Sequence, residues 1–309
     1  MRIIDEPVLR QAVTHARAVD VIRRAFRADG DGRTHVPPVI NLEIPAHRGE
    51  FHVKTAYIEG VPHVAVKIAS GFYDNAARGL PTGSGLMAVF DAATGMPVAM
   101  LLDNGFLTDI RTGAAGAIAA DVLARTDIDA VGVIGSGIQA RHQIRCLGIV
   151  RDFRRVVAWS PTTDRLRAYC DQMQADGYDV HAARSAEEVC AAADVLITAT
   201  PSHRPIVRAA WLRPGMHVSA VGADAPGKQE LEAACLRRAD LVVADRLSQC
   251  AAFGELSHAG IEENRVIELG AIVAGRASGR TTNDQITIAD LTGVGFQDTA
   301  IAAAAVADS

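Results

Sequence analysis

From about residue 130 onward, short apolar runs alternate with segments in which apolar residues recur at helical spacing. The apolar runs cover residues 130–136, 154–160, 193–200, 217–224 and 239–245. Helical segments such as TTDRLRAYCDQM and SAEEVCAAA lie between these runs. Continuous apolar strands that are separated by helices are typical of a parallel sheet covered on both faces. The pattern therefore predicts a doubly wound α/β domain over residues 116–291.

The first part of the chain has a different pattern. FHVKTAYI, PHVAVKIAS and GLMAVFDAATGMPVAMLLDN resemble antiparallel strands, with DAATGMP as a hairpin turn. TDIRTGAAGAIAADVLAR predicts a long alanine-rich helix leading into the first parallel strand. The last stretch, which ends in AIAAAAVADS, predicts a helix that returns to the first domain. We therefore expect an N-terminal α+β domain over residues 1–115, completed by residues 292–309.

Composition narrows the class of protein. With 49% hydrophobic and 22% charged residues, the 309-residue chain can form a large core, and general disorder is excluded. The net charge of −5 argues against a nucleic-acid partner. No run of 18 uninterrupted apolar residues occurs, and the opening MRIIDEPVLR lacks a signal-peptide pattern, so we expect no membrane association. The five cysteines show no CxxC spacing, which suits the cytoplasm.

The stretch AVGVIGSGIQA contains a glycine pattern of the G-x-G-x-x-A form. Gly135 permits a tight turn, Gly137 lets backbone approach a pyrophosphate, and Ala140 allows close packing of helix and strand. The N–H groups at the start of the following helix would face the anion. Because the motif follows a strand, opens a helix and belongs to a βαβ series, it predicts a Rossmann-type dinucleotide site rather than an ordinary turn.

The tip of the second strand indicates the type of dinucleotide. NAD sites usually carry an acidic residue about 20 residues after the glycines, where it binds the ribose 2′-hydroxyl. Here the strand ends in Trp159 and Ser160, without an acid. Ser160, Thr162 and Arg165 would suit a 2′-phosphate, whereas Asp164 is the candidate for a ribose contact. The cofactor is therefore expected to be NADP or NAD, with NADP favoured.

Three further residues have side chains suited to chemistry. Lys67 interrupts an apolar strand, and its alternative role is that of an edge-strand lysine. Arg111 is a cation at the start of a helix of small residues, where it would bind a carboxylate or pair with Asp109 or Asp103. Asp224 ends an apolar run, where it would act as an acid/base or cap a helix.

The histidines do not suggest a metal site. His52, His63, His203 and His258 are dispersed, without the HxH or HxxxH spacing of metal ligands. No G-x-S-x-G elbow and no P-loop occur, so acyl transfer and phosphoryl transfer have no support.

Several segments together resemble the ornithine cyclodeaminase/μ-crystallin family. They are VKIASGFYDNAARGLPT, LLDNGFLTDIRTGAAGAIAA, VGVIGSGIQA, HVSAVGADAPGKQEL and AGRASGRTTNDQITIADLTGVGFQD. They follow the family's order and cover nearly the whole chain. The resemblance implies a homodimer whose N-terminal domain provides the interface and substrate pocket, with the nicotinamide between the two domains.

The resemblance also implies roles for individual residues. Lys67 matches a substrate-contacting lysine, Arg111 a carboxylate-binding arginine and Asp224 a catalytic aspartate. Asp298 fits the family's late cofactor-contacting loop. Lys67 is thereby a catalytic as well as a substrate-binding candidate, and Thr82 and Lys54 are further substrate-binding candidates. The glycine turn, the end of the second parallel strand and the family resemblance together suggest a set of cofactor-binding residues. They are Gly135, Gly137, Ile138, Gln139, Ser160, Thr162, Arg165, Thr200, Thr112 and Gly293.

One departure from the family bears on the substrate. Members that cyclise ornithine carry an arginine in an early strand, where this sequence has Asn41 or Val39. Arg48 and Lys54 are the candidates to replace it. We therefore expect hydride chemistry on an amino or imino acid: ornithine cyclodeamination or ketimine reduction, with NADPH reduction favoured by these departures. An archaeal-type amino-acid dehydrogenase and a non-catalytic NADP(H)-binding protein are the alternatives.

Overall fold

The computed structural model describes residues 1–309, except for the side chains of Tyr73 and Ala76. The chain divides into two compact units: unit 1 comprises Met1–Arg111 and Val294–Ser309, and unit 2 comprises Thr112–Gly293. The expected boundaries were 115/116 and 291/292. The first boundary falls inside helix α3 (Phe106–Leu123), because this helix continues from one unit into the other.

Unit 1 is built on a seven-stranded sheet in the order β1-β7-β6-β5-β4-β2, with β3 also paired to β4. Its strand pairs are antiparallel except β1–β7, which is parallel. The predicted hairpin joins β6 to β7, and the Asp91 carboxylate accepts the Thr94 N–H at its turn. Its elements are β1 (Arg2–Asp5), α1 (Glu6–Ala12), α2 (His15–Gly30), β2 (Thr34–His35), β3 (Ile40–Ile44), β4 (Gly49–Ile58), β5 (His63–Phe72), β6 (Gly83–Asp91), β7 (Pro97–Leu102) and α11 (Gly295–Asp308).

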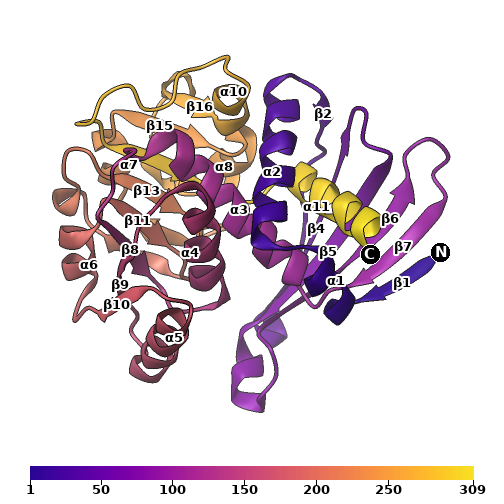
Figure 1. The fold of residues 1–309 in the computed structure, drawn as a ribbon, viewed down its shortest axis with the longest axis horizontal. Coiled ribbons are helices and arrows are strands. Elements are labelled where there is room, and N and C mark those ends of the chain that lie inside the picture. The colour runs from indigo at the N-terminus through magenta and orange to yellow at the C-terminus, as the bar shows by residue number, and fades with distance from the viewer. The chain divides into compact units, whose positions relative to one another are not determined.

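Helices α2 and α11 cover one face of this sheet (Figure 1). Helix α2 begins where the Thr14 hydroxyl accepts the Arg17 N–H, and its buried residues recur at helical spacing. Helix α11 is rich in alanine, so its backbone can lie close to the strands. The ring of Phe296 meets that of Phe26 edge to face, at 5.2 Å between centroids. The last segment of the chain thereby becomes part of the core of unit 1.

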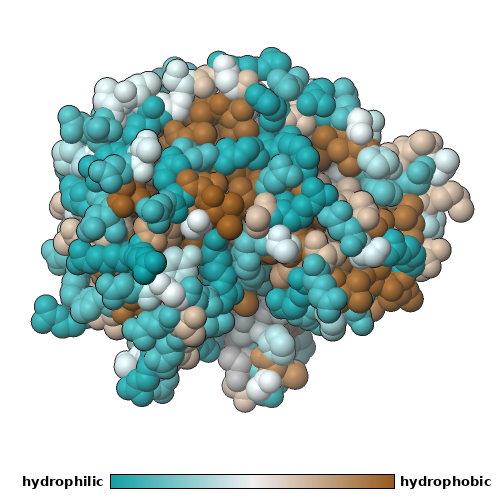
Figure 2. Space-filling model, in the orientation of Figure 1, coloured by the Kyte–Doolittle hydropathy of each residue, from teal (hydrophilic) through white to brown (hydrophobic). Residues whose placement is uncertain are grey.

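The opposite face of the sheet carries exposed apolar side chains. Successive residues of a strand point to opposite faces of the sheet. Six exposed apolar residues stand next to residues that point toward α11, so their own side chains lie on the opposite face. In the view of Figures 1 and 2, helices α2 and α11 lie in front of the sheet, so Figure 2 shows the side of unit 1 that these helices cover. The six residues are Ile3, Ile40, Leu42, Tyr57, Ile68 and Leu102.

Unit 2 contains an eight-stranded parallel sheet in the order β10-β9-β8-β11-β13-β17-β15-β16. Its central strands are fully buried, as expected for a sheet covered on both faces. A separate two-stranded parallel sheet joins β12 to β14. The elements are β8 (Ala130–Ile134), α4 (Ile138–Val150), β9 (Arg155–Trp159), α5 (Thr163–Ala175), β10 (Asp179–Ala182), α6 (Ala186–Ala192), β11 (Val195–Thr198), β12 (His203–Val207), β13 (His217–Ala220), β14 (Gln229–Leu231), α7 (Ala233–Arg238), β15 (Leu241–Ala244), α8 (Leu247–Phe253), α9 (Leu256–Ala259), β16 (Val266–Glu268), α10 (Leu269–Val273) and β17 (Thr287–Asp290).

The α/β class and the doubly wound sheet predicted for this half are confirmed, but the strands are shorter than the apolar runs. The run 217–224 continues beyond β13, which ends at Ala220, and the run 193–200 extends beyond β11 on both sides. After β13, the apolar residues Val221, Ala223 and Ala225 are buried in a loop, whereas Ala199 after β11 is half-buried. Among the described residues, no helix combines the length and apolar character needed to cross a membrane.

Candidate active site

The glycine turn of unit 2 has the backbone geometry that its sequence predicts. Gly135 has φ +116°, and a Cβ atom there would lie 2.5 Å from the Ala199 carbonyl oxygen, so a side chain is excluded. Gly137 is the N-cap of α4, and a Cβ there would meet no heavy atom within 4 Å. The turn is therefore closed on the side of the strands and open at the start of the helix.

The start of α4 fits the pyrophosphate of a dinucleotide. No side chain caps this helix, so its first N–H groups face outward from an open glycine. The Arg141 guanidinium donates to the carbonyls of Ser136 (2.7 Å) and Gly137 (2.9 Å), and these two hydrogen bonds hold the turn in place. Of the neighbouring candidates, Ile138 is 52% exposed and Gln139 is half-buried.

The tip of β9 carries the residues expected to choose between the two dinucleotides. Ser160 is half-buried, whereas Thr162 and Arg165 are exposed at the start of α5. Asp164 lies in the first turn of α5 rather than at the end of the strand. The segment after β9 thus offers hydroxyl groups, followed by the carboxylate of Asp164 and the guanidinium of Arg165 on α5. Hydroxyl and guanidinium groups suit a phosphate.

Asp224 lies in the turn between β13 and β14. It was expected at the end of a strand, with a helix cap as its alternative role. Both expectations are wrong, because β13 ends at Ala220 and the turn leads into β14 rather than into a helix. The Asp224 carboxylate accepts a 2.8 Å hydrogen bond from the Lys228 ammonium, and its side chain remains 51% exposed. A half-exposed carboxylate paired with a lysine can exchange a proton with a ligand.

In unit 1, Lys67 and Arg111 meet on a single buried carboxylate. The Lys67 ammonium lies 2.9 Å from Asp298 Oδ2, and the Arg111 guanidinium donates to Asp298 Oδ1 at 2.9 Å. Arg111 also donates to the Gln297 side-chain oxygen at 3.2 Å. The partner of Arg111 is therefore Asp298 rather than Asp109 or Asp103, the two expected alternatives. Asp298 lies in the first turn of helix α11 rather than in a loop. That the segment 291–298 contacts the cofactor remains a prediction.

Burial and charge act in opposite directions within this cluster. Burial lowers the pKa of Lys67 to about 7, although Asp298 opposes the change. Burial would raise the pKa of Asp298, but Arg111 and Lys67 hold it below its usual value. Burial raises the pKa of Asp103, whose Oδ2 caps the start of α3, to about 6. The cluster is thus rich in positive charge around an ionised Asp298.

Lys54 adds a third cation to this part of unit 1. It is 6% exposed and pairs directly across the sheet with Lys67, so the two side chains share one face. Arg48, the other candidate to replace the early arginine, is exposed and binds Asp74 at 2.9 Å. Thr82 is exposed just before β6, and its carbonyl accepts the Phe72 N–H. The structure brings Lys54, but not Arg48, to Lys67.

The remaining candidates of unit 2 have contacts within that unit. The Thr112 carbonyl accepts from Gln143 at 3.0 Å, and the Gly293 N–H donates to Asp245 at 2.6 Å. The Thr200 hydroxyl and N–H both donate to Glu230. Sequence reasoning missed Glu230. The sequence signal for it is its place in HVSAVGADAPGKQEL, one of the segments that carry the family resemblance, where Glu230 follows Asp224 by six residues.

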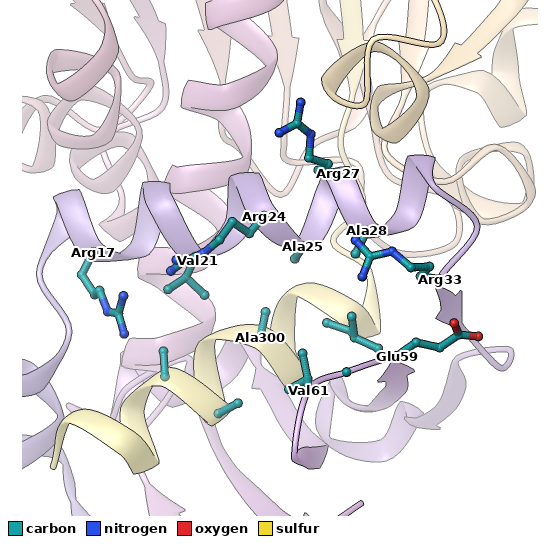
Figure 3. A pocket seen from close by; sticks show the side chains of 14 residues that line it. Arg17, Val21, Arg24, Ala25, Arg27, Ala28, Arg33, Glu59, Val61 and Ala300 are labelled. Atoms are coloured by element: carbon teal, nitrogen blue, oxygen red, sulfur yellow. The ribbon is translucent and has the colours of Figure 1, made fainter.

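One pocket of unit 1 lies away from these residues. It has a volume of about 420 Å³ and lies beside α2 and α11 in unit 1, with Val21, Ala25 and Ala300 on its apolar side (Figure 3). Four arginines belong to its lining, namely Arg17, Arg24, Arg27 and Arg33. None of the candidate site residues lines it. Among the described residues, no group of three or more metal-ligating side chains occurs.

Comparison with known proteins places these features in context. The profile of the ornithine cyclodeaminase/mu-crystallin family matches residues 6–309. A putative dehydrogenase of Rhizobium meliloti is 44% identical over 99% of this chain and 95% of its own length. The structure of Thermococcus litoralis Δ1-pyrroline-2-carboxylate reductase with NADH and L-proline has a TM-score of 0.95 at 28% identity, covering 100% of this chain and 97% of the other. An archaeal alanine dehydrogenase dimer with bound NAD has a TM-score of 0.93 at 32% identity, covering 100% and 95%.

Proposed function

Because the chain belongs to the ornithine cyclodeaminase/mu-crystallin family, we propose that it reduces the C=N bond of an imino acid carboxylate with a nicotinamide cofactor. The observation that carries this proposal is the Lys67–Asp298–Arg111 cluster, which holds two buried cations on one carboxylate. With Lys54 beside Lys67, the cluster retains positive charge that a substrate carboxylate would neutralise.

In this proposal each residue has a distinct task. Arg111 and Lys67 bind the substrate carboxylate, since their spare N–H groups are preorganised by Asp298. Asp224 takes a proton from solvent through its exposed side, donates that proton to the substrate nitrogen, and returns to the carboxylate that Lys228 stabilises. A bound reduced nicotinamide supplies the hydride that the α-carbon receives. Gly135, Gly137 and the start of α4 bind its pyrophosphate.

Reduction is favoured over cyclodeamination of ornithine because Asn41 or Val39 stands where members that cyclise ornithine carry an arginine. The buried ammonium of Lys54, opposite Lys67, adds a third positive charge near the two carboxylate-binding cations, and this charge suits the carboxylate of either substrate. An NADP preference is supported by the tip of β9, where Ser160 and Arg165 stand in place of an acid.

The assay that tests this proposal follows absorbance at 340 nm. NADPH or NADH is combined with Δ1-pyrroline-2-carboxylate, Δ1-piperideine-2-carboxylate, or pyruvate with ammonia. Parallel reactions contain ornithine and NAD+, with proline and ammonia measured as products. Oxidation of NADPH by a cyclic imine supports the proposal. Proline and ammonia from ornithine would establish a cyclodeaminase instead, pyruvate turnover an amino-acid dehydrogenase, and cofactor binding without turnover a binding protein.

Substitution of Asp224 tests the assigned proton donor. Asp224→Asn keeps the shape of the side chain but removes its acid, so turnover should fall by at least about 100-fold. Cofactor affinity, measured by quenching of protein fluorescence, should stay within about twofold of wild type. Full activity of this variant would overturn the role of Asp224.

We also propose that the protein is a cytoplasmic homodimer. The apolar face of the unit 1 sheet, with Ile3, Ile40 and Ile68 exposed, is the surface that a second copy would cover. The archaeal alanine dehydrogenase is a dimer, which supports the same assembly. The five cysteines are buried free thiols, as in proteins of reducing compartments. Light scattering after size-exclusion chromatography tests the dimer, and Ile68→Glu should dissociate it.

A further inference from the structure

We propose that Glu230 is a positioning residue, which holds the turn carrying Asp224 against the loop carrying Thr200. The inference rests on the proposed function, because it concerns how the Asp224 carboxylate is kept in place. All of the residues concerned belong to unit 2. The two segments are residues 199–202, which follow β11, and residues 221–228, which follow β13.

One carboxylate connects these two segments directly. Glu230 Oε1 accepts the Thr200 N–H and hydroxyl, both at 2.7 Å. Glu230 Oε2 accepts the Gly222 N–H at 2.8 Å and the Thr198 hydroxyl at 2.8 Å. Each oxygen therefore binds the backbone of one segment. The chain leaves the parallel sheet at these places, and the Glu230 carboxylate joins the backbones there.

The carboxylate is itself firmly held. Glu230 is completely buried, and its own N–H donates to the Glu255 carboxylate at 2.7 Å. The neighbouring Leu231 N–H donates to the second oxygen of Glu255 at 3.1 Å. Glu255 therefore holds the backbone of strand β14 in place, and the side chain of Glu230 extends from this fixed backbone to the two segments.

The two segments lie too close together to accept a side chain between them. A Cβ atom on Gly222 would lie 2.1 Å from the Thr200 carbonyl oxygen and 2.6 Å from the Glu230 carboxyl carbon. This contact requires glycine, and it means that a shift of one segment moves the other. Asp224 follows Gly222 by two residues, so its place depends on that contact.

Glu230→Gln is the informative substitution, because it preserves shape while breaking one segment contact. Whichever way the new amide is turned, its NH2 group faces a backbone N–H, either that of Thr200 or that of Gly222. Thr198→Val is the matched control. It removes a buried hydroxyl donor from the same carboxylate but leaves both backbone contacts in place.

The first measurement is amide hydrogen exchange of the cofactor-free protein. In E230Q, exchange over residues 199–202 and 221–228 should rise about tenfold, whereas T198V should resemble wild type. The second measurement is kcat, which E230Q should lower about 10- to 100-fold and T198V should leave within about twofold. A role confined to stability would give the two variants similar exchange and, in fully folded protein, unchanged kcat.

A double-mutant cycle shows whether Glu230 acts through Asp224. In the Asp224→Asn background, E230Q should change the residual single-turnover rate by less than about twofold, because the positioned group is already absent. Multiplied effects of the two substitutions would overturn the inference. If circular dichroism shows that E230Q is unfolded, Glu230→Asp replaces it, since the shorter carboxylate reaches only one segment and the same order of effects is expected.

The outcomes separate this inference from the proposed function. Full activity of D224N would remove the proposed proton donor, while the exchange measurement would still report whether Glu230 joins the two segments. Loss of activity in D224N, together with equal exchange and equal kcat in E230Q and T198V, would overturn the role of Glu230 alone.

Discussion

Buried carboxylates occur in both units, but they are stabilised in different ways. In unit 1, Asp298 is completely buried between the ammonium of Lys67 and the guanidinium of Arg111. In unit 2, Glu230 and Glu255 are equally inaccessible, yet the bonds described above come from backbone N–H groups and hydroxyls rather than from cations. A buried charge can thus be balanced by an opposite charge or solvated by backbone dipoles.

The two arrangements give pKa values that move in opposite directions. Burial would raise the pKa of Asp298, but Arg111 and Lys67 lower it instead. Burial raises the pKa of Glu230 to about 7 and that of Glu255 to about 8, because the hydrogen bonds they accept only partly offset desolvation. Unit 1 therefore keeps an ionised carboxylate beside its cations, whereas unit 2 uses carboxyl groups to hold its loops in place.

The largest effect is expected from removing the carboxylate of unit 1. Asp298→Asn leaves Lys67 and Arg111 buried without a counter-charge, so the free energy of unfolding should fall by about 3–5 kcal/mol. Guanidinium chloride unfolding, followed by circular dichroism, measures the change.

The same helix offers a matched control. Asp308 on α11 binds Arg17 at 2.8 Å, but both side chains are about one-third exposed, at 31% and 35%. Asp308→Asn should therefore lower the free energy of unfolding by at most about 1 kcal/mol. Equal effects of the two substitutions would show that burial of the Asp298 pair contributes nothing beyond a surface ion pair.

A smaller effect is expected on the pH dependence of carboxylate binding. The pKa of Lys67 is lowered to about 7 by burial, so its ammonium is present below this pH and lost above it. The Kd for L-proline in the presence of NADH should rise about tenfold between pH 6 and pH 8. In Lys67→Met, binding should be weak and independent of pH over this range.

Fluorescence titration at fixed ionic strength measures these affinities. NADH affinity, measured in the same titrations, serves as the internal control, since the glycine turn lies in unit 2. A wild-type Kd for L-proline that stays constant from pH 6 to pH 8 would contradict a carboxylate-binding Lys67.

Local pattern was sufficient to predict much of the fold. The alternation of apolar runs and helices identified the parallel sheet, because buried parallel strands need uninterrupted apolar residues. The GSGIQA turn was recognisable because positive φ at Gly135 and the open helix start at Gly137 leave few choices of residue. The ends of the strands could not be predicted, because the apolar residues after Ala220 are buried in a loop and have the same pattern in the sequence as a buried strand.

Long-range partners could not be predicted in the same way. Arg111 pairs with Asp298, which is 187 residues away in sequence, and nothing local distinguishes this acid from Asp109 or Asp103. Glu230 binds Thr198 and Thr200 over separations of 32 and 30 residues, through the packing of one loop on another. The family resemblance supplied candidate roles for Lys67 and Arg111, but the carboxylate that orients them became visible only in three dimensions.

The smallest predicted effect concerns Asp290 at the end of β17, whose carboxylate Oδ2 accepts the Leu256 N–H at 2.9 Å. Burial raises the pKa of Asp290 to about 7, well above the value near 4 of an unfolded aspartate, and the neighbouring Asp245 adds to this rise. The native state therefore binds more protons than the unfolded state above pH 4, and its free energy of unfolding declines as pH rises toward 7.

Asp290→Asn removes this titration while the oxygen of the new amide can still accept the Leu256 N–H. Relative to wild type, the variant should gain about 1 kcal/mol in free energy of unfolding between pH 6 and pH 8. Denaturant unfolding at both pH values measures the gain. The same comparison for Asp308→Asn should show no such gain, because its ion pair with Arg17 lies at the surface. An equal gain in free energy of unfolding in both variants would mean that the buried carboxyl of Asp290 does not set the pH dependence of stability. The buried carboxyls of unit 2 and Asp298 of unit 1 would then differ in their contacts but not in how they titrate.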